Sequence, residues 1–144
     1  MIEKDTVRLL RECDAGVKMG ISSIDDVLKY VKDENLKSLL EENKTEHEDL
    51  DRDLQELLDK YNDEGKEPNP MAKGMSWIKT NVKLAFNESD KTIAELITDG
   101  CNMGVKSLGQ YLNEYKAADE KSKDICKKLI NLEEKLTVRM REFL

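Results

Sequence analysis

The side-chain types most often used for catalysis and metal binding are scarce in this chain, and two of them carry the main site hypothesis. His47 is the only histidine, and it lies on the apolar stripe of a segment that is expected to be helical. Glu133 lies on the apolar stripe of a later segment. Because an imidazole and a carboxylate can together bind iron, manganese or zinc, we take His47 and Glu133 as candidate metal ligands, with Glu46 and Asp14 as further candidates.

His47 and Glu133 are expected at a similar height in the fold. Each follows a predicted interhelical turn by about the same number of residues, and a helix rises about 1.5 Å per residue. Two other interpretations remain open. The two groups can be a buried, hydrogen-bonded pair that fixes helix alignment, because a buried polar group must be paired. Alternatively, His47 is partly exposed. Asp14 is expected near an end of the bundle, with water or a lysine as its partner.

The three cysteines do not form a motif. Cys13, Cys101 and Cys126 are odd in number and contain no Cys-x-x-Cys pair, which argues against a disulfide framework and a thiolate zinc site. Cys13 and Cys101 are a candidate redox pair, but nothing near them in sequence would lower a thiol pKa, so we expect buried, reduced thiols. No nucleophile–base pair or phosphate-binding loop can be assembled either, and enzymatic activity is not expected.

Four segments have the periodicity of amphipathic helices. Apolar residues recur at steps of three and four, which places one stripe on one helix face. The predicted helices cover residues 5–31, 35–61, 90–116 and 120–143. The polar residues at 32–35 and 117–120 are expected to be tight turns, so that the helices form two antiparallel hairpins. Asn87, Ser89 and Asp90 offer N-capping oxygens for the third helix.

The hairpins are joined by a long connection, residues 62–89. It begins with a polar stretch that contains both prolines of the chain, which predicts a loop. A short basic crossover helix is expected at residues 71–86. Trp77 within it can pack the crossover against the bundle while the neighbouring lysines stay solvated, or it can form a partner-binding strip with them.

Composition limits the class of protein and its partners. The 144 residues predict a single four-helix-bundle domain, 1–144, with 38% hydrophobic and 38% charged residues. The net charge of -7 repels phosphate groups, so nucleic acid and membrane surfaces are not expected as partners. No apolar stretch approaches the roughly 18 residues of a membrane span, and a cytoplasmic protein is expected.

The two halves of the chain resemble each other. Residues 13–18 (CDAGVK) parallel residues 101–106 (CNMGVK), and each segment lies in the first helix of a predicted hairpin. Residues 19–24 (MGISSI) also parallel residues 103–108 (MGVKSL), so two registers that differ by one helical turn remain open. The glycines in these segments permit close approach of neighbouring helices. Duplication of one hairpin would produce a pseudo-two-fold arrangement, with chance similarity as the alternative.

Two hairpins joined by a long crossover resemble the ferritin-like superfamily. More narrowly, residues 74–79 (GMSWIK), Asp90 and residues 99–104 (DGCNMG) are similar to small bacterial ferritin-like domains of uncharacterised function. The resemblance implies a four-helix bundle with one long crossover. It also implies a di-iron or di-manganese site, in which two helices each supply a Glu and the other two each supply Glu-x-x-His.

The chain departs from that ligand pattern. One histidine cannot supply two Glu-x-x-His motifs, and the residue three before His47 is Lys44. Residues 131–135 (NLEEK) contain no imidazole, and Asn102 and Val105 stand where metal-binding relatives tend to carry carboxylates. Ferroxidase or peroxidase chemistry of the usual kind is therefore not expected.

One functional hypothesis and two alternatives follow. The first is a ferritin-like bundle without a complete di-iron site, a non-catalytic structural or interaction protein that forms a homo-oligomer through an apolar helix face and needs no cofactor. The second is an atypical metal-binding protein or oxidoreductase that holds iron, manganese or zinc around His47 and Glu133. The third is a helical adaptor unrelated to ferritins, which would have a different helix order.

Overall fold

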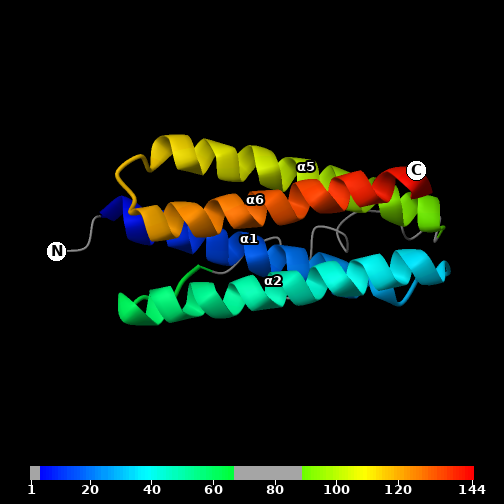
Figure 1. The fold of residues 1–144 in the computed structure, drawn as a ribbon, viewed down its shortest axis with the longest axis horizontal. Helices are drawn as coiled ribbons and strands as arrows, with labels where there is room; N and C mark the ends of the chain where they lie inside the picture. Colours follow the sequence, from blue (N-terminus) through cyan, green and yellow to red (C-terminus); the bar gives the residue numbers. More distant parts are fainter. Residues whose placement is uncertain (1–3, 67–88) are drawn as a thin grey trace.

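A computed structural model describes residues 4–66 and 89–144, and these residues fold into four long helices (Figure 1). These helices are α1 (Lys4–Leu28), α2 (Glu34–Lys60), α5 (Asp90–Glu114) and α6 (Glu120–Met140), and α6 continues into a short 3-10 helix, η2 (Arg141–Phe143). The expectation of an all-helical four-helix bundle is confirmed, and no strand occurs within the described ranges. The crossover helix expected at 71–86, with Trp77, lies outside the described residues.

Side-chain caps determine where three of the helices begin. Asp33 precedes α2 and accepts hydrogen bonds from the backbone amides of Asn35 at 2.8 Å and Leu36 at 3.0 Å. Ser89 caps α5 through the amide of Thr92, and Asp119 caps α6 through the amide of Ser122. Each cap satisfies amides that have no partner inside the helix.

All four α-helices end one to three residues before their predicted limits, and α1 and α6 differ the most. α1 ends at Leu28 instead of residue 31, because the chain tightens into a turn in which the Tyr30 amide donates to the Val27 carbonyl. The last residues of the helix expected at 120–143 form η2 instead of α-helix. At both positions the stripe continues past the helix, since side chains in a turn can also pack on the core.

The two turns lock the hairpins together at opposite ends of the bundle. Asp90, in the first turn of α5, accepts hydrogen bonds from the amides of Lys32 and Asp33 in the α1–α2 turn. At the other end the amide of Asp119, before α6, donates to Thr6 in α1. As Figure 1 shows, α1 and α6 therefore run in one direction, and α2 and α5 run in the other.

The hydrophobic core is divided into two clusters. The first lies where α1 and α6 end and α2 and α5 begin, and it consists of Ile24, Val27, Leu36, Leu40, Ile93, Ala94, Leu96, Ile97, Cys101, Leu136 and Met140. The second lies at the other end and consists of Leu9, Leu10, Cys13, Val17, Leu50, Leu54, Leu58, Leu108, Ala118, Ile125, Cys126 and Leu129. The break between the clusters falls at the middle of every helix.

No helix within residues 4–66 and 89–144 has a stretch that is both long enough and apolar enough to cross a bilayer.

The contact between Asp90 and the α1–α2 turn gives a first prediction. We expect Asp90→Ala to lower the free energy of unfolding by about 1–3 kcal/mol, because two amides lose a charged acceptor. Urea denaturation measures this change, and Lys91→Ala, at an exposed neighbouring position, is the control. If both variants were equally stable, the two hairpins would not depend on this contact.

Candidate functional site

A layer of polar residues separates the two core clusters. We call it the polar layer and define it as Gly20 on α1, Asn43 and His47 on α2, Gly104 on α5 and Glu133 on α6. His47 is 1% exposed, Asn43 4% and Glu133 7%. The alternative that His47 is partly exposed is therefore wrong, because α2 directs the imidazole into the bundle. Each buried polar group here needs a partner or must be neutral.

Asn43 fixes the orientation and tautomer of His47. The Nδ1 atom of His47 lies 3.0 Å from the backbone carbonyl oxygen of Asn43, one helical turn earlier. A carbonyl can only accept, so Nδ1 carries the proton and Nε2 presents a lone pair. Nε2 is buried and has no hydrogen-bond partner among the described residues. Burial lowers the pKa of His47, so the ring is neutral at pH 7.

Glu133, like His47 and the Oδ1 atom of Asn43, lacks a complete set of hydrogen-bond partners among the described residues. Its Oε2 atom is buried and forms no hydrogen bond within the described part of the chain. Burial raises the pKa of Glu133 to about 8, because the charged form loses its hydration. At pH 7 the side chain is therefore mostly a neutral acid that can donate a hydrogen bond.

Two glycines make room for these side chains. A Cβ atom at Gly20 would lie 2.9 Å from both Cδ2 and Nε2 of His47. A Cβ atom at Gly104 would overlap the carboxyl group of Glu133. The layer is therefore built from two pairs, each with one polar side chain lying against a glycine of a neighbouring helix.

His47 and Glu133 both line one small cavity. Its volume is about 30 Å³, and Ser23 and Cys101 also contribute to its wall. By this measure a water molecule needs roughly 10–15 Å³, so the cavity has room for a water molecule or an ion of similar size. Burial raises the pKa of Cys101, so Cys101 lines the cavity as a neutral thiol.

The donor set does not fit a two-metal centre. Across residues 4–66 and 89–144, no group of three or more His, Cys, Asp or Glu side chains is arranged to hold a metal ion. The cavity offers a metal ion two ligands, the imidazole nitrogen of His47 and the carboxyl group of Glu133. Cys101 could become a third ligand only by losing its proton, which its raised pKa opposes. A metal ion here would therefore be a single ion that keeps water or small anions in its remaining positions.

Asp14 is not part of this site. It is fully buried in α1 and accepts hydrogen bonds from Lys18 Nζ at 3.0 Å, Gln55 Nε2 at 2.7 Å and the amide of Lys66 at 2.9 Å. The predicted lysine partner is Lys18. The other alternative, contact of Asp14 with water, does not fit a side chain that is 0% exposed. Asp14 instead binds the segment that follows α2, through the amide of Lys66. Gly65 permits this close approach, since a Cβ atom there would overlap the Asp14 carboxylate.

Glu46 lies outside the cavity as well. Its Oε1 atom accepts a hydrogen bond from Lys135 Nζ at 3.1 Å, which joins α2 to α6 on the outer side of the bundle. Glu46 directly precedes His47 on α2, and successive residues of an α-helix point about 100° apart, so the two side chains diverge. Of the four candidate ligands, the fold brings only His47 and Glu133 together.

The three cysteines are free and buried, as expected from the sequence, and the alternative of a Cys13–Cys101 redox pair is wrong. Cys13 belongs to the second core cluster and Cys101 to the first, so these two are not brought together. Cys13 instead forms a hydrogen bond with Cys126 on α6. This hydrogen bond, together with burial, raises the pKa of the Cys13 thiol. Sequence spacing carries no signal for a contact between α1 and α6. The place of Cys101 on the cavity wall was likewise missed, although it lies one turn before Gly104 on the stripe of α5.

Comparison of the chain with protein-family models, curated proteins and solved structures finds no match.

The buried carboxyl group gives a prediction about pH. The unfolded chain loses the Glu133 proton near pH 4.5 and the folded chain near pH 8, so the free energy of unfolding should fall as the pH rises between these values. We expect Glu133→Gln to be more stable than the wild type by a few kcal/mol at pH 9, at about 1.4 kcal/mol per pKa unit, and to differ little at pH 5.

Urea denaturation at pH 5, 7 and 9 measures this difference. Glu134→Gln removes the neighbouring carboxylate, which is exposed on α6, and serves as the matched control with no such pH dependence. A stability difference between Glu133→Gln and the wild type that stayed constant with pH would contradict the assignment of a raised pKa to this group.

Proposed function

We propose that this chain is a ferritin-like bundle that serves as a non-catalytic structural or interaction protein, with the polar layer aligning its helices. The helix directions support the first part. α2 ends at the opposite end of the bundle from the start of α5 (Figure 1), and one long crossover between the second and third helices is the connectivity of ferritin-like bundles. A helical adaptor with short connections throughout would not place these two ends so far apart.

The polar layer contains three buried atoms without a hydrogen-bond partner among the described residues: Asn43 Oδ1, His47 Nε2 and Glu133 Oε2. The observation that carries the proposed role is the match between the last two. His47 Nε2 can accept a hydrogen bond, and the protonated Glu133 carboxyl group can donate one. Both line a cavity that has room for a bridging water. Two neutral groups bridged in this way are far less costly to bury than two charges.

Such a pair specifies the alignment of the helices. A shift of α2 or α6 by one turn would move His47 or Glu133 into one of the apolar clusters and leave both atoms without a partner. The same shift would remove the glycine that lies against each side chain. Buried polar pairs are known to select one alignment at some expense of stability, and this is the structural role that we assign to the layer.

A second candidate function is binding of one divalent metal ion at His47 and Glu133. The observation that favours it is the Asn43 carbonyl, since metal-binding imidazoles usually donate their other ring N–H to a carbonyl or carboxylate. Iron, manganese or zinc would suit one nitrogen and one carboxylate oxygen. The ion would have to displace the Glu133 proton, so its affinity would increase as the pH rises toward about 8.

Elemental analysis distinguishes these two functions. The protein is purified without a tag or chelator and compared with His47→Ala by inductively coupled plasma mass spectrometry. Under the structural proposal, both proteins contain far less than one equivalent of iron, manganese or zinc. Near-stoichiometric metal that is lost in His47→Ala, with helicity unchanged by circular dichroism, would favour the second candidate instead.

A double-mutant cycle tests the structural role directly. His47→Ala, Glu133→Ala and the double variant are unfolded in urea with chelator present. Because the two groups are bridged, we expect the effects to be non-additive by about 1 kcal/mol or more. Additivity within about 0.5 kcal/mol would show that the two side chains do not interact and would overturn the proposed pairing.

A further inference from the structure

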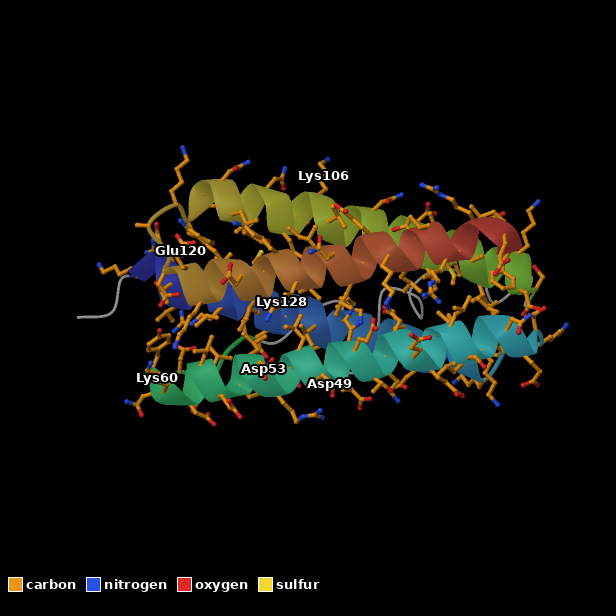
Figure 2. All side chains as sticks on the ribbon, in the orientation of Figure 1. Asp49, Asp53, Lys60, Lys106, Glu120 and Lys128 are labelled. Atoms are coloured by element: carbon orange, nitrogen blue, oxygen red, sulfur yellow. The ribbon has the colours of Figure 1, made fainter. Side chains whose placement is uncertain are left out.

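A groove runs along the outer side of the bundle between α2 and α6. We call it the α2–α6 groove, and its volume is about 360 Å³. The α2 side of the groove consists of Glu46, Asp49, Leu50 and Asp53. The α6 side consists of Lys128, Asn131, Leu132 and Lys135. Figure 2 shows Asp49 and Asp53 on α2 and labels Lys128 in the same region.

The two sides of the groove carry opposite charge. All charged groups on the α2 side are acids, and both on the α6 side are lysines. The partly buried Leu132 and the largely buried Leu50 line the groove between these two sides. Glu46 and Lys135 already form an ion pair across one part of the groove. Among the described residues, Asp53 and Lys128 form no ion pair, so the charge separation is uncompensated there.

We infer that the α2–α6 groove is an interface between two copies of this chain. A surface with one acidic and one basic side is complementary to itself when a two-fold axis runs along the groove, parallel to the helices. Such an axis places α6 of each copy over α2 of the other without changing height along the bundle. Lys128 of one copy then faces Asp53 of the second, and the contact occurs twice, as in isologous dimers.

Other occupants and other axes fit less well. A two-fold axis across the groove would place α2 on α2 and bring its acids together. A phosphate-rich partner would meet the acids of α2, and a basic partner would meet Lys128 and Lys135. The same groove on a second copy of the chain places lysines opposite the acids and acids opposite the lysines.

The size of the face indicates a weak dimer. α6 has 21 residues, so the face is about 30 Å long, and two helices side by side are about 20 Å wide. About 600 Å² per copy is at the low end of specific interfaces. Because the complementary charges are at the surface, the dimer should weaken as the salt concentration rises.

Sedimentation velocity with charge-swapped variants tests the interface. At low salt the wild type should sediment as a monomer–dimer mixture that shifts to monomer at about 0.5 M salt. Asp53→Lys and Lys128→Asp each create two like-charge contacts and should weaken dimerisation at least tenfold. An equimolar mixture of the two variants restores both attractive contacts and should form heterodimers, and the Asp53→Lys/Lys128→Asp double variant should form homodimers.

The control is Lys106→Asp, which makes the same charge change at an exposed position on α5, away from the groove (Figure 2). It should leave the dimer affinity within about twofold, and circular dichroism checks that every variant is folded. A wild type that stays monomeric at high concentration and low salt would overturn the inference. A dimer that persists in both single variants would also overturn it.

This inference deepens the proposed interaction role by naming a partner, but it uses residues outside the polar layer. Failure of the charge swaps would therefore leave the pairing of His47 and Glu133 untouched. Additivity in the double-mutant cycle would, in turn, leave the interface standing.

Discussion

A pair of buried polar groups in the middle of the bundle is the constraint on which the rest of the structure depends. His47 and Glu133 occupy positions on apolar stripes, and a low-dielectric interior accepts such groups only when they are neutral or paired. Burial meets this condition by lowering the pKa of His47 and raising the pKa of Glu133, so that both groups are mostly neutral at pH 7, and both groups line one small cavity. The core is divided into two apolar clusters because this layer lies between them.

The layer also determines which small residues the neighbouring helices need. Gly20 and Gly104 lie against His47 and Glu133, and a methyl group at either position would collide with the polar side chain. The two glycines belong to α1 and α5, the first helices of the two hairpins, and the polar side chains belong to the second helices. This pattern has the pseudo-two-fold symmetry that the internal similarity of the sequence suggests.

Polar contacts at the ends of the helices fix how the chain enters and leaves the bundle. Asp14 and Arg11 on α1 bind the segment that follows α2: Asp14 accepts from the Lys66 amide, and Arg11 donates twice to Asp63. Gly65 allows this approach with a positive φ of 80°. Together with Asp90 at the α1–α2 turn, these contacts restrain both ends of the bundle, which lie far from the polar layer. The residues that line the α2–α6 groove take no part in these end contacts.

The sequence by itself determined the helices, their approximate limits and the height of the polar layer. Apolar periodicity and capping residues such as Ser89 are local properties, and helical rise relates residue number to height, so the shared level of His47 and Glu133 follows from the sequence alone. Only the tertiary structure decided which groups meet. The rotation of each helix and the choice of its neighbours removed Asp14 and Glu46 from the site, added Cys101 and the Asn43 carbonyl, and paired Cys13 with Cys126. A stripe shows which face of a helix is buried, but the partner across that face depends on the packing of all four helices at once.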